Sequence, residues 1–336
     1  MKQITRLIAL SIFILASISQ MHAKIWIVNY VGQGDYTSFQ AAHDAATAGD
    51  TIYVIGSPAV YDAGKGLTLS KQLIIIGPGY FLMQNSNLTV TTSTASVGTI
   101  TINPAAAGTV IKGMEINGIN CNSNNIAISR NHITSGINLG NAGFIVSNIV
   151  ITQNFMDNSG IVDGVPGSLS ILIANNIFNY GGSSLLSFWG AAVIVLNNIF
   201  DGNGSGTLDF ESGGTLTFQN NILEGISSVY LTAGASVSNN VCEGTQLSAG
   251  NGNLLHVNMA NVFVGSGSTD AQWQLKTGSP AIGAGVGGVD CGAFGGSSPY
   301  VLSGIPPIPQ VYFLNAPFYG SNTSGLPITV KVRTNN

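Results

Sequence analysis

One pattern recurs three times in the middle of this chain, as IVITQNFMDNSG at residues 149–160, ILIANNIFNYGG at 171–182 and VIVLNNIFDGNG at 193–204. In each copy two aliphatic residues, two positions apart, come before an asparagine, and another apolar residue follows two positions after it. A spacing of two is strand periodicity, so both members of each aliphatic pair face the same side. The pattern predicts two short strands in each unit, joined by a one-residue corner at the asparagine.

The asparagine recurs well beyond these three copies. The full column consists of Asn131, Asn154, Asn176, Asn198, Asn221 and Asn240, at separations of 23, 22, 22, 23 and 19 residues. Three positions earlier stands an apolar column: Ile128, Ile151, Ile173, Val195, Phe218 and Val237. Asparagine tolerates a left-handed backbone, and stacked asparagines can exchange amide hydrogen bonds. A period near 22 with inward apolar columns indicates a solenoid whose strands form parallel sheets with a spacing of about 4.8 Å.

Two other repeat-compatible folds fit less well. Leucine-rich repeats have a similar period, but their leucine consensus is absent and no segment between the asparagines has a helical pattern. A β-sandwich requires hairpins, whereas equivalent residues recur here in one direction. The sequence therefore predicts an all-β parallel β-helix with coils of about 22 residues.

The beginning of the chain has the features of an export signal followed by a cap. Residues 1–23 combine Lys2 and Arg6, an apolar run too short to span a bilayer, and Ala23 at a plausible cleavage point. We expect a mature chain from about Lys24 that is not membrane-spanning. Residues 36–48 have the only helical pattern, ended by Gly49, which predicts a short helix that caps the solenoid.

Composition limits the partners of the mature chain. Charged residues make up 7% of the sequence, against about 25% in ordinary soluble domains. Without the signal peptide, eight basic and fourteen acidic residues give a net charge of −6, which argues against nucleic-acid binding. No group of residues has metal-ligand spacing, and no cofactor is expected. Three scattered cysteines are too few for a disulfide framework, and their pairing stays open: Cys121, Cys242 and Cys291.

Two further stretches resemble segments of known proteins. GDYTSFQAAHDAATAGDTIYV, residues 34–54, resembles the opening of bacterial pectate-lyase-like proteins. WQLKTGSPAIGAG at 273–285, with VDCGAFGG at 289–296, is similar to the closing segment of extracellular β-helix proteins, often described as a choice-of-anchor module. The resemblance implies a right-handed parallel β-helix over residues 24–296 and a secreted or cell-surface protein. It implies no particular reaction, because the superfamily includes lyases, hydrolases, esterases and inactive proteins.

The remaining residues, 297–336, form a tail with a different composition. Three prolines, Pro306, Pro307 and Pro309, interrupt regular structure, and LPITVKVRTNN at 326–336 predicts one terminal strand. The tail resembles extensions of secreted or surface proteins of Gram-negative bacteria. It could serve as a sorting or anchoring extension, or pack against the last coil.

Candidate functional residues come from the strands predicted for the first sheet, where such proteins usually bind their ligands. Alternation is expected to direct one residue per coil outward: Asn138, Asp163, Ser187, Asp209 and Tyr230. We predict Asp163, Asp209 and Glu211 as catalytic acids, because glycosidic cleavage uses paired carboxylates. Asp163 and Asp209 would be about 9.6 Å apart, and Asp209 and Glu211 about 6.6 Å apart. The predicted substrate-binding residues are Asn138, Ser187, Trp189 and Tyr230.

Two functions remain open at this point. The first is a polysaccharide-binding surface protein, which would be a polysaccharide hydrolase or lyase if it is an enzyme. The second is a non-catalytic structural or adhesin-like β-helix, in which the same acids are isolated, solvated charges. A pectate-lyase mechanism is disfavoured, because that family uses a basic residue beside acidic calcium ligands and the proposed face has no Lys or Arg.

Overall fold

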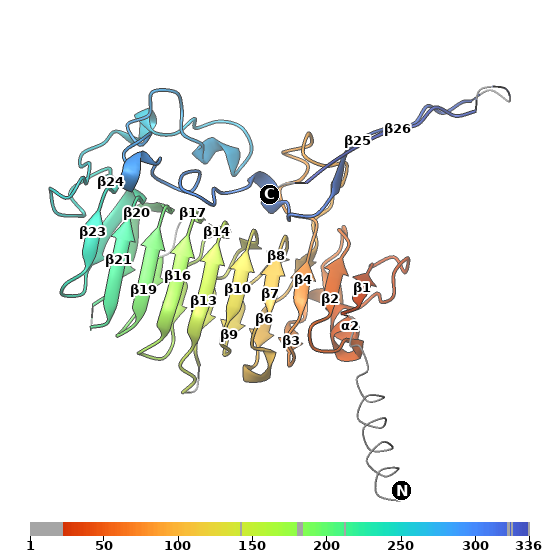
Figure 1. The fold of residues 1–336 in the computed structure, drawn as a ribbon, viewed down its shortest axis with the longest axis horizontal. Helices are drawn as coiled ribbons and strands as arrows, with labels where there is room; N and C mark the ends of the chain where they lie inside the picture. Colours follow the sequence, from red (N-terminus) through yellow and green to blue (C-terminus); the bar gives the residue numbers. More distant parts are fainter. Residues whose placement is uncertain are drawn as a thin grey trace, which may run out of the picture.

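The protein is described by a computed structural model over residues 23–141, 143–179, 184–211, 213–320, 323 and 325–334. The predicted signal peptide, residues 1–23, lies outside these residues except for Ala23. The described chain winds into a parallel β-solenoid, with its strands side by side along one axis (Figure 1). The predicted fold class, an all-β parallel β-helix with coils of about 22 residues, is confirmed.

One side of the solenoid is a ten-stranded parallel sheet, which faces the viewer in Figure 1. Its strands contain the aliphatic pairs that precede the asparagines. In spatial order they are β1 (Ile25–Val28), β2 (Thr51–Val54), β4 (Ile74–Ile76), β7 (Val110–Lys112), β10 (Ile126–Ser129), β13 (Ser147–Thr152), β16 (Leu169–Ala174), β19 (Ala192–Leu196), β21 (Thr215–Gln219) and β23 (Ser236–Ser238).

The other strands of the solenoid form a fourteen-stranded sheet with two rows, which the long strands β20 (Ile199–Asp209) and β22 (Ile222–Tyr230) join. The second row follows the corner of each coil, which contains a ladder asparagine from Asn131 onward. Its strands are β5 (Ser96–Val97), β8 (Glu115–Ile116), β11 (His132–Ile133), β14 (Phe155–Asp157), β17 (Ile177–Asn179) and β24 (Val241–Cys242). The first-sheet row comes later in each coil: β3 (Leu67–Leu69), β6 (Ile100–Ile102), β9 (Ile119–Cys121), β12 (Ile137–Leu139), β15 (Ile161–Asp163) and β18 (Leu186–Ser187).

The core consists of side chains stacked in register from coil to coil. Ile128, Ile151, Ile173, Val195 and Phe218 are direct partners along successive strands, and all five are fully buried. Each such side chain contributes about 1.5–3 kcal/mol relative to an exposed one. The predicted inward column is therefore the continuous interior of the solenoid.

The corner differs from the prediction in one respect. It contains two residues, because β10 ends at Ser129 and β11 begins at His132. The left-handed backbone belongs to the first of the two, Arg130, at φ 56°, and not to the ladder residue Asn131. The same holds in later coils, where the left-handed residues are Gln153, Asn175, Asn197, Asn220 and Asn239. The ladder asparagines are fully buried, so their role is hydrogen bonding and not backbone conformation.

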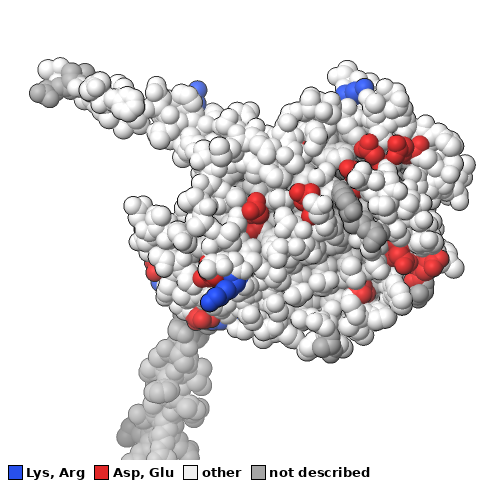
Figure 2. Space-filling view, turned by 180° about the vertical axis from the view of Figure 1, so that it is seen from behind, with Lys and Arg blue, Asp and Glu red and all other residues white. Residues whose placement is uncertain are grey.

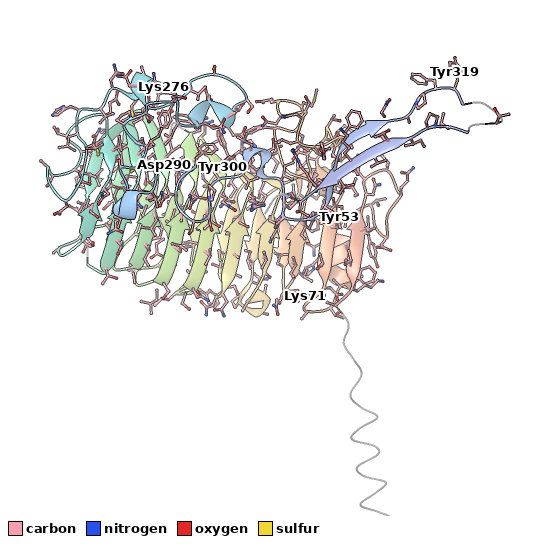
Figure 3. All side chains as sticks on the ribbon, turned by 45° about the horizontal axis from the view of Figure 1, so that its top comes forward. Tyr53, Lys71, Lys276, Asp290, Tyr300 and Tyr319 are labelled. Atoms are coloured by element: carbon pink, nitrogen blue, oxygen red, sulfur yellow. The ribbon has the colours of Figure 1, made fainter. Side chains whose placement is uncertain are left out.

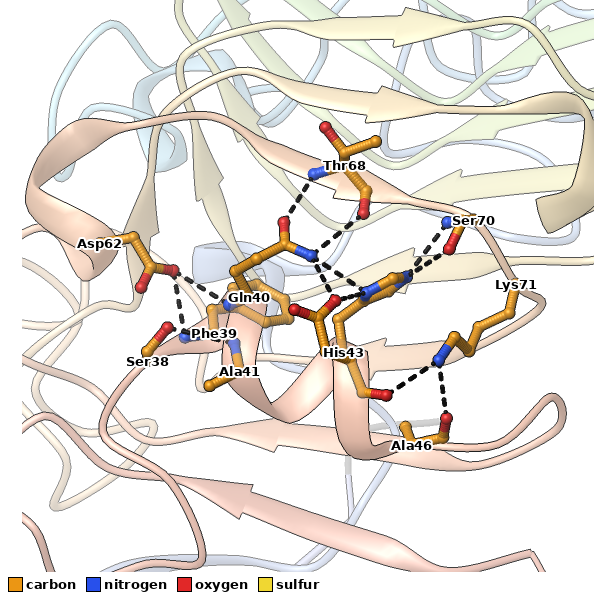
Figure 4. A network of polar contacts seen from close by, with 11 residues as sticks. Ser38, Phe39, Gln40, Ala41, His43, Ala46, Asp62, Thr68, Ser70 and Lys71 are labelled. Carbon is orange, nitrogen blue, oxygen red and sulfur yellow. Dashed lines mark hydrogen bonds and ion pairs between the residues drawn. The ribbon is translucent and has the colours of Figure 1, made fainter.

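The predicted capping helix is α2 (Phe39–Ala45), and it covers the first coils with the buried side chains of Phe39 and Ala42. Its N-terminus is held by Ser38, whose hydroxyl accepts from the Ala41 amide at 3.1 Å, and by Asp62, which accepts from the Phe39 amide at 3.0 Å (Figure 4). Asp62 is the second residue of the distorted turn η1 (Tyr61–Gly64). These contacts satisfy amides that a short helix leaves unpaired.

A C-terminal layer, residues 257–305, packs across the second row. It has little regular structure beyond four short 3₁₀ turns: η3 (Met259–Asn261), η4 (Ala271–Trp273), η5 (Val286–Gly288) and η6 (Leu302–Gly304). A further 3₁₀ turn, η2 (Pro104–Ala106), lies in the solenoid and not in this layer. The layer covers an outward apolar column of the second row: Phe155, Ile177, Ile199, Ile222 and Val241. Figure 3 labels Lys276, Asp290 and Tyr300 on this layer. The solenoid thus has a second apolar core on its outside.

A buried polar network fixes this layer to the loop before Val90. Asp270 accepts from the Asn85 amide at 3.0 Å and from the Ser303 backbone N–H at 2.6 Å. The hydroxyls of Tyr80 and Tyr300 are 2.6 Å apart, and burial raises the pKa of both. Because all these groups are buried and paired, they specify one position for the layer.

The first residues of the tail, 297–305, belong to the C-terminal layer, and the rest of it contains a two-stranded antiparallel hairpin, β25 (Gln310–Asn315) and β26 (Thr329–Arg333), that projects from the body (Figure 1). The predicted terminal strand is present as β26. The alternative prediction, that this strand packs against the last coil, is wrong, because β26 pairs with β25. The hairpin base contacts the loop of residues 87–90, where the Val90 amide donates to the Val311 carbonyl at 2.9 Å. Tyr319 lies toward the far end of the projection (Figure 3).

The three cysteines are free and buried. Burial raises the pKa of Cys121 to about 11 and those of Cys242 and Cys291 to about 12. Thiolates are the reactive form, so these thiols are chemically inert in the folded protein.

Candidate functional site

The first-sheet row carries one outward column of side chains in direct register. Asn138 pairs with Val162, Val162 with Ser187, Ser187 with Asp209, and Asp209 with Tyr230. The structure therefore brings together four of the five residues predicted for this column. The column continues backward to Asn120, which accepts a hydrogen bond from the Asn138 amide at 3.1 Å.

The expected outward orientation of Asp163 is wrong. Asp163 pairs with Leu139 and is 8% exposed, and Val162 takes the outward position. The reason is that Ile161 stacks on Ile137 inside the coil, so strict alternation directs the second residue outward and the third inward. Ser168 donates to the Asp163 carboxylate at 2.8 Å, and burial raises its pKa. The predicted acid pair of Asp163 and Asp209 is therefore not formed on the outer face.

The remaining predicted residues, Trp189 and Glu211, each come two positions after a member of the column, Ser187 and Asp209. The Asp209 carboxylate accepts from the Glu211 backbone N–H at 3.1 Å, which gives Asp209 a local structural role. Glu211 is exposed, and Trp189 and Tyr230 are 51% and 44% exposed. Two amphipathic rings and several hydrogen-bonding groups thus share one accessible surface.

A second polar column, missed at the sequence level, follows the second row. We call it the acidic row: Asp157, Asn179, Asp201, Glu224 and Glu243. Asp157 pairs with Asn179, Asn179 with Asp201, and Asp201 with Glu224. Glu243 follows directly after the pair of Leu223 and Cys242. The face turned away from the viewer of Figure 1 carries several groups of acidic side chains and few basic ones (Figure 2).

The sequence contained the signal for this row. Each member is the third residue after a ladder asparagine, so the same spacing that predicts the core also aligns these polar positions. Near one end, Asp157 accepts from the Asn179 amide at 3.0 Å, and the His132 ring, whose Nε2 lies 3.8 Å from the carboxylate, is the main cause of its lowered pKa. Toward the other end, the groups that shift the pKa values of Asp201 and Glu224 include no basic side chain.

Glu224 is the most perturbed member of the acidic row. Burial, and then the charges of Asp201 and Glu243, raise its pKa to about 7. Such a carboxyl exchanges its proton near neutral pH and can donate as well as accept a hydrogen bond. Perturbed carboxyls of this kind are often found in ligand sites.

Glu224 also lines a pocket of about 470 Å³ between the acidic row and the C-terminal layer. The other lining residues are Met259, Ala260, Phe263, Val264, Gly265, Gln272 and Trp273. Trp273 is 8% exposed, and its indole N–H has no hydrogen-bond acceptor in the described structure. The lining is thus mainly apolar, with few polar groups, as in small-molecule sites.

Neither a metal-binding cluster nor a membrane-spanning helix is present in the part of the chain that the structure describes. There, no group of three or more His, Cys, Asp or Glu side chains could hold a metal ion. Over the same residues, no helix has the length and apolar character needed to cross a bilayer.

Comparison of the chain with protein-family models, with curated proteins and with solved structures found no match. The class of the protein therefore comes from its own structure, which is a parallel β-solenoid. In general this fold supports either a structural or a carbohydrate-active β-helix protein.

Proposed function

We propose that this is a secreted or cell-surface β-helix protein that binds polysaccharide along the outward face of its first-sheet row. The observation that carries the proposal is the register of Asn138, Ser187, Asp209 and Tyr230, with Trp189 exposed beside them. The column repeats every coil, at about 4.8 Å, so an extended polymer can contact several coils at once.

The chemistry of this face suits a sugar chain. Exposed Trp and Tyr rings offer flat apolar surfaces with a polar edge, which match the apolar face and the hydroxyls of a sugar ring. Asn138, Ser187 and Asp209 add donors and acceptors beside them. A weak, repeated set of contacts of this kind gains affinity by multivalency along the polymer.

The proposal is binding without bond cleavage on this face. Glycosidic cleavage needs two carboxyl groups beside the scissile bond. Asp163 faces inward, and Asp209 is engaged by the Glu211 backbone. Asp209 and Glu211 are accordingly proposed as ligand contacts, together with Asn138, Ser187, Trp189 and Tyr230.

Location and relationship are part of the same proposal. The resemblance of residues 34–54 and 273–296 to pectate-lyase-like and choice-of-anchor segments supports export from a Gram-negative bacterium. The tail, residues 297–336, would then be the sorting or anchoring extension.

The second candidate function is a structural or adhesin-like role, which one observation favours. The projecting hairpin presents Phe318 and Tyr319 at 96% and 90% exposure. Exposed aromatic residues on a projection are typical of surfaces that contact another macromolecule.

Glycan-array binding by the chain from Lys24 onward tests the proposal. We expect binding to at least one polysaccharide, and a loss of at least about tenfold in affinity for the double variant Trp189→Ala, Tyr230→Ala, equivalent to about 1.4 kcal/mol. Tyr319→Ala is the matched control, because it removes an exposed tyrosine far from the face. Absence of any glycan binding, or equal binding by the double variant and wild type, would refute polysaccharide recognition at this face.

A further inference from the structure

The pocket at Glu224 lies on the same two strands as the proposed polysaccharide face. β20 carries Asp201 near its start and Asp209 at its end, and β22 likewise carries Glu224 and Tyr230. The strands pair at both ends, Asp201 with Glu224 and Asp209 with Tyr230. Glu224 and Tyr230 are six positions apart in the sequence, so their backbones are at most about 20 Å apart.

The pocket differs from the face in shape and lining. The face is a row of exposed side chains, whereas the pocket is a partly open hollow of about 470 Å³, within the usual range for small-ligand sites. Met259 and Phe263 form apolar walls, and Glu224 and Gln272 supply hydrogen-bonding groups. The indole N–H of Trp273, another wall residue, has no acceptor in the described structure. One compact ligand with an apolar face and several hydroxyls would pack on these walls and bond to Glu224 and Gln272.

Charge selects among such ligands. Asp201, Glu224 and Glu243 occupy successive coils, and the charges of the outer two act on Glu224. The Lys276 ammonium donates to the backbone carbonyl of Ala260 on the pocket wall, and Lys276 is not one of the lining residues. An anionic sugar in the pocket would meet the carboxylates of the acidic row, so a uronic acid or a sulfated sugar is disfavoured.

We propose that this pocket binds the terminal residue of a neutral glycan whose preceding units lie on the first-sheet face. The inference rests on the proposed polysaccharide binding, and it adds chain-end recognition and a preference for uncharged sugars. The apolar face of the sugar packs on Met259 and Phe263, and its hydroxyls bond to Glu224 and Gln272.

Calorimetric titration with a panel of neutral disaccharides, and with disaccharides of the same linkages that contain a uronic acid, tests the pocket. We expect at least one neutral disaccharide to bind with a dissociation constant below about 10 mM, and its uronic acid counterpart to bind at least about tenfold more weakly. Two variants should each weaken the neutral ligand at least tenfold. Glu224→Ala removes the carboxyl, and Ala260→Trp obstructs the pocket from an exposed wall position without altering the core.

Controls separate this inference from the proposed function. Asp44→Asn, an exposed acid on the capping helix, should bind like wild type, and so should the double variant Trp189→Ala, Tyr230→Ala with the disaccharide. Polymer binding without disaccharide binding, or disaccharide binding unchanged in both pocket variants, would overturn the pocket and leave polysaccharide binding intact. Disaccharide binding that disappears in the face variant would also overturn it. Loss of both kinds of binding in wild type would overturn both proposals.

Discussion

Replacing one buried ladder asparagine should destabilise the solenoid far more than replacing an exposed one. Asn176 is fully buried in the middle of the ladder, and its side chain makes four hydrogen bonds. Its amide donates to the Ile151 carbonyl at 2.9 Å and to the Asn198 side-chain oxygen at 3.0 Å. Its oxygen accepts from the backbone N–H and the side-chain amide of Asn154, at 2.9 and 3.0 Å.

The cost of Asn176→Ala follows from which partners remain satisfied. The Asn154 side-chain amide keeps the Ile128 carbonyl, and the Asn198 oxygen keeps the Asn176 backbone N–H. The Asn154 backbone N–H loses its acceptor inside the protein, which costs about 1–3 kcal/mol. With about 0.5–1.5 kcal/mol for each of the three other lost bonds, the free energy of unfolding should fall by about 2.5–7.5 kcal/mol.

The control is Asn138→Ala, which removes an exposed asparagine with a single inter-coil hydrogen bond, to Asn120 at 3.1 Å. We expect it to cost less than about 0.5 kcal/mol. Urea unfolding, followed by circular dichroism, measures the free energy of unfolding of both variants. Hydrogen exchange with mass spectrometry shows whether the loss of protection is confined to the coils around Asn176, as we expect for a solenoid with nearest-neighbour coupling. A cost for Asn176→Ala within about 1 kcal/mol of the control would show that the buried ladder is not a main source of stability.

Three further predictions concern other parts of the molecule. Gly304→Ala should lower the urea midpoint strongly, because the added Cβ would lie 2.2 Å from the Tyr80 ring. The control variant Gly287→Ala places its Cβ in open space and should cost only about 1 kcal/mol of backbone strain, so equal midpoints for the two variants would contradict the prediction. The raised pKa of Glu224 means that the folded state holds a proton that the unfolded state loses, so stability falls as pH rises from about 4.5 to about 7. Glu224→Gln should therefore add about 1–2 kcal/mol at pH 8, after allowance for its partial exposure, and nothing at pH 4; the same gain at both pH values in urea unfolding would refute the assignment. Three buried cysteines should resist a thiol reagent in the folded protein at pH 8 and react fully in denaturant: Cys121, Cys242 and Cys291. Rapid labelling of any one of them in the native state would contradict its burial.

The solenoid was predictable because its determinants are local and repeated. An inward residue such as Ile151 is recognisable from its place before the asparagine, and the same place recurs in the next coil with Ile173. The detail of the corner was not predictable from the asparagine alone. Two adjacent polar residues occupy it, and only the three-dimensional structure shows that the first, such as Asn175, takes the left-handed conformation while the second, Asn176, is buried.

The candidate site was less predictable, because it depends on register to a single residue. Asn138 and Asp163 were assigned to one face, yet they are the second and third residues of strands that begin with the stacked pair Ile137 and Ile161. An error of one position reverses the direction of a side chain on a strand. Glu224 was predictable from its spacing after Asn221, but its raised pKa was not, since that depends on the cover supplied by the C-terminal layer.

That cover explains why two adjacent residues after each ladder asparagine are apolar. Ile177 and Phe178 point to opposite faces of their strand, and both are fully buried, which requires apolar material on each side. The sequence indicates that a cover exists, but the covering residues, such as Met259 and Ala281, are far along the chain and carry no repeat that identifies them. The cover also directs the function that we propose. It covers the outward apolar column of the second row, forms a pocket with Glu224 at its margin and leaves Trp189 and Tyr230 exposed. A ligand that contacts both the pocket and the first-sheet face would therefore follow β20 and β22 between them.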